Sequence, residues 1–570
     1  YRGMWRYAGI RDLLNVVKGS VLGTLLFVIY LTMVYHFSGV SRAIIIIDMI
    51  LTISSIGGFR LIIRLYHQRD TKFFNELLFW RRAEKDRKKV LIVGTGSLAE
   101  KLLRELVDTN KLKYEPVGFV EKSKLYRGLK IHGIPILGGF KDLPALIDYH
   151  GIGVVLIADP ELKPRDISEV VEICGDYGVQ IKVIPSLSER INGSISDKMR
   201  NIDVIDLLER EPVVLNVDLI KSEIEGQDVL VTGAGGSIGS ELCRQITRLN
   251  PNKIILFDNA ETPLYEIDME LGSYGSKTTI IPCIGDIRSR RSLERVFNKH
   301  KPGLVYHAAA YKHVPMMEVS PLDAINNNII GTYKLATVSH KHGVKKFVMI
   351  STDKAVRPTS IMGATKRAAE LIVQSMNGNG TKFITVRFGN VLGSNGSVVP
   401  LFKRQIAAGG PVTVTHPQVT RYFMTIPEAV TLVLQAGLLG KGGELFILDM
   451  GEPVKILDLA KNMIRLAGLI PGRDVKIDFI GLRPGEKLYE ELLVDGEDVI
   501  DTVHEKIKVC KNKNGISEET IFECVERFSL LLGNSSDNRA YIEVLKRMIP
   551  SFQHNLEERG FRSNHMKAAD

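Results

Sequence analysis

Cysteine is scarce in this chain: five cysteines are spread over 570 residues, and no C-x-x-C pair occurs. A disulfide framework needs a regular set of cysteines, and a zinc site needs cysteine or histidine ligands at short spacings. Neither pattern is present, so we expect no metal site and a reducing compartment. The thiols themselves are expected to be buried and inert.

Excess charge is also missing from most of the chain, although the net charge of the whole is +10. Residues 1–89 contain 15 Lys/Arg against 6 Asp/Glu, whereas the remaining residues contain 60 against 59. Basic residues beside apolar segments set membrane topology and contact anionic lipid. We therefore expect a lipid bilayer as a partner and no nucleic acid.

Two long apolar runs occupy residues 19–35 and 43–59, the second interrupted only by Asp48. Each is close to the roughly 20 residues that a membrane-spanning helix needs. The short link between them predicts a transmembrane helical hairpin, with both ends cytoplasmic by the positive-inside rule. Asp48 is expected to form helix–helix or interfacial hydrogen bonds.

Two α/β regions follow these runs. In the first, Gly94 and Gly96 lie between a strand and a helix, and further strands are predicted at 116–120, 154–158 and 180–185. A helix amino end can hold a phosphate, but a lone G-x-G is a weak signal. We expect a structural or regulatory role for this region.

The second α/β region carries a stronger dinucleotide signal. Gly233, Gly236 and Gly239 come directly after a strand and lead into a helix, where the backbone can approach a pyrophosphate. Asp258 ends the next predicted strand. A carboxylate there accepts hydrogen bonds from both ribose hydroxyls and repels a 2′-phosphate, so NAD is favoured over NADP.

Residues 348–366 concentrate the chemistry: V-M-I-S-T-D-K-A-V-R-P-T-S-I-M-G-A-T-K. The first three residues predict a buried strand, and residues 351–354 follow its carboxyl end, where open α/β sheets bind ligands. Pro358 delays the next helix, which opens with good helix formers. A hydroxyl, a carboxylate and an amine are thereby predicted to lie beside Lys366.

This layout resembles that of short-chain dehydrogenase/reductase enzymes, which pair Ser/Thr with a Tyr-x-x-x-Lys on the next helix. Thr352 and Lys366 fall in register, but Met362 occupies the tyrosine position. Together with Asp353 and Lys354, this pattern resembles the membrane-bound UDP-N-acetylglucosamine 4,6-dehydratases of bacterial surface-glycan synthesis, a family in which Met replaces Tyr. The resemblance covers nearly the whole chain.

The resemblance implies an α/β fold with a small Rossmann-like domain followed by an extended short-chain dehydrogenase/reductase domain with a doubly wound parallel sheet. It also implies NAD, UDP-N-acetylglucosamine, a homo-oligomer, and a multi-pass location in the bacterial inner membrane with a cytoplasmic catalytic domain. Members usually have four spans, and sequence upstream of Tyr1 would account for the other two. We expect membrane helices with a basic segment at 1–75, the Rossmann-like domain at 76–190, a connector at 191–225, the catalytic domain at 226–505, and a helix with a polar tail at 506–570.

The family pattern further implies which residues bind. The expected cofactor contacts are Gly233, Gly236, Ser237, Ile238, Gly239, Asp258, Asn259, Asp286, Ile287, Ala308, Ala309, Ala310 and Lys366. The expected substrate contacts are Lys312, Asn390, Asn395, Arg421, Arg483 and Glu486. Asn328 is expected to brace the active-site helix, and His313 is open between a structural hydrogen bond and acid–base work.

A 4,6-dehydration moves hydride from sugar carbon 4 to NAD⁺, removes a proton from carbon 5 and the hydroxyl from carbon 6, and returns hydride to carbon 6. We assign Lys354 as the base at carbon 5 and Asp353 as the acid at carbon 6, with the swapped assignment left open. Lys354 would need a lowered pKa, which burial and nearby cations favour. Lys366 is expected to hold the nicotinamide ribose and Met362 to pack on the substrate, and the carbon-4 proton leaves through Thr352, Asp353 or a water.

Four alternatives remain. A sugar-nucleotide epimerase shares the fold and cofactor but needs no acid at carbon 6, and a dehydratase that inverts carbon 5 resembles shorter, tyrosine-containing chains. The missing tyrosine suggests an inactive membrane sensor. A sugar-phosphate transferase accounts for the membrane segment and the first domain but not for the dinucleotide-binding half.

Overall fold

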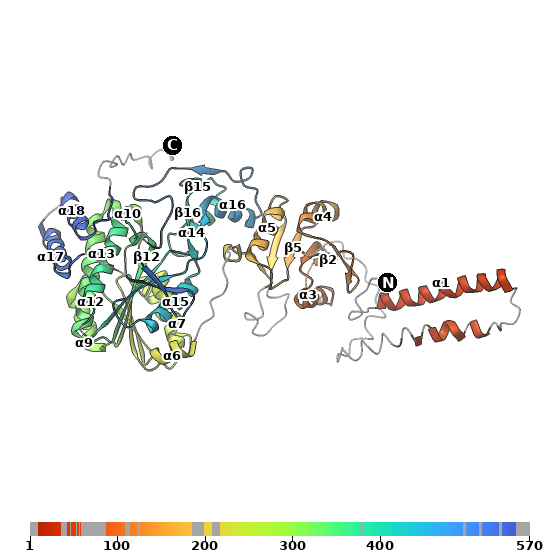
Figure 1. The fold of residues 1–570 in the computed structure, drawn as a ribbon, viewed down its shortest axis with the longest axis horizontal. Coiled ribbons are helices and arrows are strands. Elements are labelled where there is room, and N and C mark those ends of the chain that lie inside the picture. Colours follow the sequence, from red (N-terminus) through yellow and green to blue (C-terminus); the bar gives the residue numbers. More distant parts are fainter. Residues whose placement is uncertain are drawn as a thin grey trace. The chain divides into compact units, whose positions relative to one another are not determined.

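The computed structural model describes residues 10–35, 41, 43–45, 47–52, 54–55, 58, 87–108, 114–122, 126–184, 199–207, 217–378, 380–493, 498–511, 516–534 and 538–554. The chain forms two compact units (Figure 1). The first contains residues 1–207 with 464–470, and the second contains residues 208–463 with 471–570.

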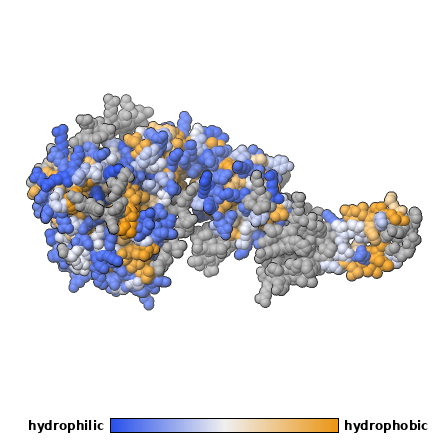
Figure 2. Space-filling model, viewed as in Figure 1, coloured by the Kyte–Doolittle hydropathy of each residue, from blue (hydrophilic) through white to orange (hydrophobic). Residues whose placement is uncertain are grey.

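The N-terminal helix α1, Ile10–Tyr35, covers the first apolar run. Its segment Val17–Val34 is the one helix among the described residues that is long and apolar enough to cross a membrane. The second run contains a shorter apolar helix, Ala43–Thr52. Apolar side chains cover much of the described surface of these helices (Figure 2). One such helix is consistent with membrane association, whereas the predicted transmembrane hairpin is not confirmed.

A seven-stranded sheet forms the centre of the first unit, in the order β3-β4-β2-β1-β5-β6-β7. Its strands are β1 (Lys88–Val93), β2 (Tyr114–Val120), β3 (Lys130–Ile131), β4 (Ile134–Gly138), β5 (Val154–Ile157), β6 (Gln180–Val183) and β7 (Arg200–Asn201). Its α-helices are α3 (Ser97–Asp108), α4 (Leu143–His150) and α5 (Pro164–Gly175). The three strands predicted at 116–120, 154–158 and 180–185 correspond to β2, β5 and β6. Strands β2 and β5 flank β1 in parallel, and β6 pairs in parallel with β5.

The second unit is built on a nine-stranded sheet in the order β10-β9-β8-β11-β12-β13-β18-β22-β21. The strands are β8 (Asp228–Thr232), β9 (Lys253–Asp258), β10 (Thr279–Ile284), β11 (Leu304–His307), β12 (Lys346–Thr352), β13 (Lys382–Phe388), β18 (Leu445–Leu448), β21 (Asp498–Asp501) and β22 (Ile507–Lys511). The first seven strands in this order are parallel, and the last two are antiparallel. The order reverses at β8, so the ligand crevice is expected outside the carboxyl ends of β8 and β11. The predicted α/β fold with a doubly wound parallel sheet is confirmed.

Helices cover both faces of this sheet (Figure 1). The α-helices from residue 217 onward are α6 (Val217–Ile224), α7 (Ser237–Arg248), α8 (Glu261–Gly272), α9 (Arg290–His300), α10 (Val314–Val319), α11 (Pro321–Ala324), α12 (Thr332–Lys341), α13 (Ile361–Ser375), α14 (Val398–Ala407), α15 (Ile426–Leu439), α16 (Ile456–Leu466), α17 (Glu518–Asn534) and α18 (Asn538–Met548). One apolar cluster joins α6, α7, α8 and α15 to one face, and a second joins α9, α12 and α13 to the other. Parallel strands that are buried on both faces read as continuous apolar runs, as I-I-L-F and F-V-M-I do here.

Short two-stranded pairs lie among the segments that follow β13. They are β14 (Asn390–Val391) with β17 (Phe423–Met424), β15 (Val412–Val414) with β20 (Ile477–Phe479), and β16 (Thr420–Arg421) with β19 (Val454–Lys455). These pairs place Asn390 and Arg421, two of the expected substrate residues, on strands.

The C-terminal part of the chain is more ordered than the sequence predicted. We expected one helix and a polar tail, but α17 is followed by α18, and the two pack together against α13. Phe528 and Tyr541 are fully buried in this cluster with Met362 of α13. The expected disordered end of the tail lies outside the described residues.

Candidate active site

The active-site stretch folds as a strand, a tight turn and a helix. β12 extends through Thr352, one 3₁₀ turn covers Asp353–Ala355, and α13 begins at Ile361. Ser360 caps this helix, because its hydroxyl accepts the backbone N–H of Gly363 at 3.1 Å. The predicted strand ended at 350, so Ser351 and Thr352 belong to the strand.

Two neighbouring hollows gather the predicted binding residues. A cavity of about 620 Å³ is lined by Gly233, Gly236, Ser237, Ile238, Gly239, Ala308, Ala310, Lys312, His313, Thr352, Lys354, Met362, Lys366, Asn390, Asn395, Arg421, Arg483, Glu486 and Glu490, among others. A second hollow of about 300 Å³ is lined by Gly233, Gly236, Asp258, Asn259, Asp286, Ile287, Ala308, Ala309, Ala310 and Asn395, among others. Of the expected site residues, only Asp353 lines neither hollow.

The glycine turn after β8 admits no side chain at its closest points. A Cβ at Gly239 would overlap the carbonyl oxygen of Gly233, and a Cβ at Gly233 would lie 2.7 Å from the backbone nitrogen of Ala309. The turn leads directly into α7, whose first residue is Ser237. This is a cradle that lets a ligand approach the backbone at a helix amino end, as pyrophosphate binding requires.

Asp258 stands at the rim of the smaller hollow, where β9 ends. Its carboxylate accepts the N–H of Gly235 and the N–H of Ala260, each at 2.9 Å. These bonds fix the carboxylate beside the glycine turn, where a ribose hydroxyl would meet it.

Asp286 is held by a neighbour that the sequence analysis did not name. Arg288 donates to both carboxylate oxygens of Asp286, at 2.6 to 3.1 Å. Burial alone would raise the pKa of Asp286, but the hydrogen bonds from Arg288 outweigh it and lower that pKa. The carboxylate is therefore ionised and oriented in the smaller hollow.

Asn328 braces α13 as expected. Its amide exchanges hydrogen bonds with the backbone of Tyr311 at 2.9 and 3.0 Å, and it donates to Thr365 of α13 at 3.1 Å. Asn328 lies in the π-helical turn Ile325–Gly331, a distortion common at functional sites. The turn brings one amide into contact with both the cavity wall and the active-site helix.

The expected substrate residues divide into two kinds of environment. Arg421 is nearly buried and already donates to Glu486 at 3.0 Å and to the carbonyl oxygens of Thr420, Lys487 and Leu488. Arg483 is exposed at the cavity, and its backbone N–H donates to Glu486 at 3.1 Å. The fork of Arg421 thus positions the segment around Glu486 in this structure, and a direct contact with a diphosphate stays a prediction.

The other expected substrate residues lie at different parts of the cavity wall. Lys312 is partly desolvated, and burial lowers its pKa. Burial, followed by the charge of Lys312, also lowers the pKa of His313, which packs against Gly396. The backbone N–H of Asn395 donates to Ser237 at 3.2 Å, so Asn395 borders the glycine cradle as well as the substrate side.

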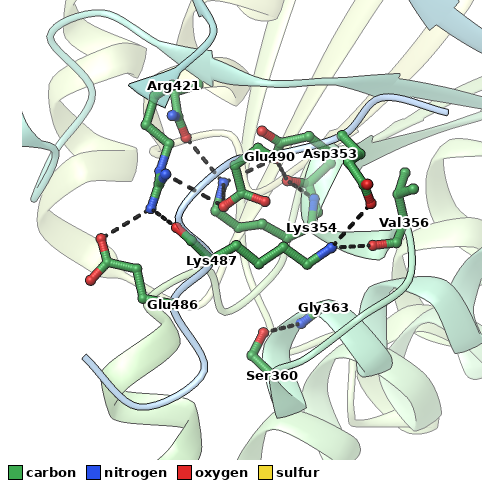
Figure 3. A network of polar contacts seen from close by, with 12 residues as sticks. Asp353, Lys354, Val356, Ser360, Gly363, Arg421, Glu486, Lys487 and Glu490 are labelled. Carbon is green, nitrogen blue, oxygen red and sulfur yellow. Dashed lines mark hydrogen bonds and ion pairs between the residues drawn. The ribbon is translucent and has the colours of Figure 1, made fainter. Parts of the chain in front are cut away.

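Asp353 and Lys354 interact directly (Figure 3). Asp353 is fully buried, and its Oδ1 accepts the Thr352 hydroxyl at 2.8 Å and Lys354 Nζ at 3.0 Å. Its other oxygen, Oδ2, is buried and has no hydrogen-bond partner within the described part of the chain. Thr352 and Lys354, which both bond to this carboxylate, line the cavity.

Lys354 has a second charged neighbour, Glu490, which the sequence did not predict. Its Nζ lies 3.2 Å from Asn390 Oδ1 and 3.4 Å from an oxygen of Glu490. Burial alone would lower the pKa of Lys354, but the charges of Asp353 and Glu490 outweigh it and raise that pKa. The expectation of a lowered pKa is therefore wrong for the chain without ligands, because it counted only burial and cations.

Glu490 gave no signal in the sequence. It belongs to L-Y-E-E-L-L, where two adjacent acids are typical of a solvated face, yet Glu490 is buried and Glu491 is not. Only the pairing of distant segments brings it to Lys354.

Lys366 lies on α13 with its Nζ donating to the carbonyl oxygen of Ile350 at 2.8 Å. Burial lowers its pKa to about 8, against the weaker opposing effect of Glu370. Met362, one turn earlier on α13, is also nearly buried and shares the cavity wall.

We expect the Lys366 amine to react with a small acylating reagent with a midpoint near pH 8, compared with about 10.4 for a free lysine. Burial disfavours the ammonium form, so the reactive amine is populated at lower pH. Peptide mass spectrometry of the folded chain labelled between pH 6 and 11 measures this midpoint. The urea-unfolded chain is the control, and an equal midpoint in both states would contradict the expectation.

Comparison with known proteins places this site in a family. The family model described as "Polysaccharide biosynthesis protein" matches residues 229–512. The "Capsular polysaccharide biosynthesis protein CapD" of Staphylococcus aureus is 44% identical over 515 residues, which are 89% of this chain and 84% of that protein. The chain belongs to this family of polysaccharide biosynthesis proteins. A second model, "CoA-binding domain", matches residues 1–185.

Further relatives of this chain are named as sugar-nucleotide enzymes. A "UDP-N-acetylglucosamine 4,6-dehydratase (inverting)" of Campylobacter jejuni is 36% identical over 279 residues, 48% of this chain and 79% of that protein. A "UDP-glucose 4-epimerase" of Rickettsia canadensis is 36% identical over 280 residues, 48% of this chain and 78% of that protein. Among solved structures, the UDP-glucose 4-epimerase of Thermus thermophilus in complex with NAD is 24% identical, covering 46% of this chain and 90% of that one with a TM-score of 0.40.

Proposed function

We propose that this chain is an NAD-dependent UDP-N-acetylglucosamine 4,6-dehydratase that forms a UDP-4-keto-6-deoxy-N-acetylhexosamine for surface-glycan synthesis. The observation that carries the proposal is the bonded pair Asp353–Lys354 at the end of β12, beside a cavity shared with Lys366 and the glycine cradle. An elimination needs an acid and a base close together, and this pair supplies both.

The residues present fit NAD. A Cβ at Gly233 or Gly239 would occupy the space of the cradle, so glycine is needed at both positions. The fixed carboxylate of Asp258 favours a free 2′-hydroxyl on the ribose over a 2′-phosphate. Lys366 borders the same cavity and is the residue that would hold the nicotinamide ribose. When bound, NAD supplies the hydride acceptor and donor.

Each protein group has one assigned task. Lys354 removes and returns the proton of carbon 5, and Asp353 donates a proton to the departing oxygen of carbon 6. Thr352, which donates to Asp353 at 2.8 Å, can pass on the proton of the carbon-4 hydroxyl. Met362 provides apolar contact at the cavity wall, and Lys312, Asn390 and the 483–486 segment bind the nucleotide part.

An epimerase is the second candidate, because relatives of equal identity bear that name. It has no use for an acid at carbon 6, whereas Asp353 lies within hydrogen-bond distance of the base. Retention at carbon 5 is part of the proposal, since Lys354 both removes and returns the proton from one side. An inactive sensor would require none of these bonded groups.

The deciding experiment incubates the full chain in detergent with UDP-N-acetylglucosamine in deuterated water. The expected product is lighter by one water, carries a 4-keto group and a 6-methyl group, and holds deuterium at carbon 5. Mass spectrometry and NMR detect these features. No cofactor is added to the reaction when the purified protein retains its NAD.

Each other outcome selects an alternative. Unchanged mass with a new configuration at carbon 4 identifies an epimerase, and inversion at carbon 5 identifies the inverting reaction. Saturable binding without turnover, after reconstitution with NAD, identifies a sensor.

The location follows from the N-terminal segment. We propose a multi-pass protein of the bacterial inner membrane, with α1 and the apolar residues 43–59 as a hairpin and the catalytic unit in the cytoplasm, where nucleotide sugars are made. The basic residues that flank both apolar runs support this orientation. A homo-oligomer stays a prediction that mass photometry can test. The five-part division of the chain stays a prediction that limited proteolysis can test.

A further inference from the structure

Glu490 lies on segment 483–493, which forms neither helix nor strand but is held firmly. Arg421 donates to the carbonyl oxygen of Lys487 at 2.9 Å, and Arg387 donates to the carbonyl oxygen two residues after Glu490 at 3.2 Å. Arg387 lies on β13, and Arg421 lies on β16. The backbone beneath Glu490 is therefore fixed on both sides.

The side chain of Glu490 faces Lys354 (Figure 3). It is 3% exposed and lies 3.4 Å from Lys354 Nζ and 3.8 Å from Arg421 Nε. The ammonium of Lys354 thus has three oxygens around it, from Asp353, Asn390 and Glu490. The contacts with Asp353 and Asn390 are hydrogen bonds, and the contact with Oε1 of Glu490 is an ion pair.

Of these three groups, Glu490 is the best placed to receive the proton of Lys354. The amide of Asn390 is not a base, and Asp353, whose Oδ1 accepts from Thr352 and Lys354, is already the proposed acid at carbon 6. Oε1 of Glu490 is the oxygen that faces Lys354, and its Oε2, like Oδ2 of Asp353, is buried and has no hydrogen-bond partner within the described part of the chain. A buried carboxylate oxygen without a partner is costly, and protonation removes that charge.

We infer that Glu490 shares the proton of Lys354 and thereby allows a lysine that is charged at rest to act as the base of the proposed dehydration. This inference rests on the proposed function. Glu490 acts through Lys354, so it is a positioning residue for the proton.

The exchange begins and ends with Lys354 as an ammonium and Glu490 as a carboxylate. First, the N–H bond of the Lys354 ammonium breaks and an O–H bond forms on Glu490, leaving an amine and a carboxylic acid. The amine then takes the proton of carbon 5, and the C–H electron pair forms the double bond between carbons 5 and 6 as the C–O bond of carbon 6 breaks. The hydroxyl of carbon 6 leaves as water with a proton that Asp353 has received from the carbon-4 hydroxyl through Thr352. When hydride has returned to carbon 6, Lys354 returns a proton to carbon 5 and regains one from Glu490.

The charges around the pair support this exchange. Asp353, Lys354, Arg421 and Lys487 are the charged groups that face Glu490. Burial raises the pKa of Glu490, and the charge of Asp353 adds to this effect, whereas Lys354, Arg421 and Lys487 oppose it. Because the pKa of Glu490 is raised, protonating it beside a neutral amine costs less than protonating an exposed glutamate.

The kinetic test compares Glu490→Gln with Glu491→Gln in the full chain. The two positions are adjacent on one segment, but Glu491 is partly exposed and pairs with Arg357. We expect Glu490→Gln to lower kcat by about 10²-fold with little change in KM, because it removes a proton acceptor and not a substrate contact. Its kcat should rise with pH as solvent replaces the carboxylate, whereas Glu491→Gln keeps the pH profile of the unmodified chain.

Chemical rescue provides a readout that a structural role would not move. In Glu490→Ala, added formate should restore part of kcat, since a small carboxylate can occupy the vacated space. A loss of kcat that is equal at every pH and unchanged by formate would overturn the inference. So would full activity of Glu490→Gln with an unshifted pH profile.

A second measurement needs no turnover. The pH midpoint for acylation of Lys354, read by peptide mass spectrometry, should fall by about 1–3 units in Glu490→Gln because an anionic neighbour is lost, and should stay in place in Glu491→Gln. If UDP-N-acetylglucosamine is not dehydrated but this midpoint moves, the proposed function fails and the coupling of Glu490 to Lys354 stands. If product forms but the midpoint does not move, the coupling alone is overturned.

Discussion

Replacing Glu370 by glutamine is expected to destabilise the second unit by about 3–5 kcal/mol, because the change leaves a buried arginine without its counter-charge. Arg387 and Glu370 are both essentially unexposed and are joined by two hydrogen bonds, at 2.8 and 3.1 Å. Glu370 also accepts the hydroxyl of Ser351 at 2.6 Å and pairs with Arg367. The pair thus ties β13, α13 and the active strand β12 together.

Urea unfolding of the full chain, followed by circular dichroism, measures the loss as a lower midpoint. Glu523→Gln on α17 is the matched control, since Glu523 forms a largely exposed pair with Arg547. Exposed pairs contribute little, so this change should barely move the midpoint. Equal midpoints for the two variants would show that the buried pair does not stabilise the fold.

The pH dependence of this difference has a definite sign. Burial alone would raise the pKa of Glu370, but Arg387 and Arg367 outweigh it and hold that pKa at about 2. The pKa of a free glutamate is about 4.3. The stabilisation from the ionised Glu370 is therefore fully present above that pH and is lost as the pH falls toward 2. The difference in stability between the unmodified chain and Glu370→Gln should therefore shrink below about pH 4.3.

The sequence was sufficient wherever a feature depends on neighbouring residues. The glycine turn at 233–239, the strand before Thr352 and the helix after Pro358 each follow from local sterics and capping, and the structure has all three. The alternation of strands and helices also predicted the parallel sheet. These features require no knowledge of which distant segments meet.

The errors concern features that depend on distant segments. The pKa of Lys354 is set by Glu490, and the sequence gives no sign that L-Y-E-E-L-L returns to the end of β12. Arg387 reads as an ordinary polar interruption in T-V-R-F, yet it is buried with Glu370. Helix α18 was missed because its apolar face acquires a partner only when α17 and α13 are in place.

Replacing Lys354 by methionine is expected to lower the rate of product formation by about 10³–10⁴-fold, because a methionine of similar length cannot take the proton of carbon 5. Lys354 contacts Asp353, Asn390 and Glu490, so a fold check is needed. Unchanged circular dichroism and retained NAD would show that the loss is chemical.

Asp353→Asn provides the contrasting variant, and deuterated water separates the two roles. With Lys354 as base and Asp353 as acid, Asp353→Asn should still exchange the proton of carbon 5, so recovered UDP-N-acetylglucosamine carries deuterium there without losing water. Lys354→Met should show neither exchange nor elimination. The reverse pattern would assign the base to Asp353, which its short bond to Thr352 also permits, since the hydroxyl can relay a proton from the cavity to the buried carboxylate.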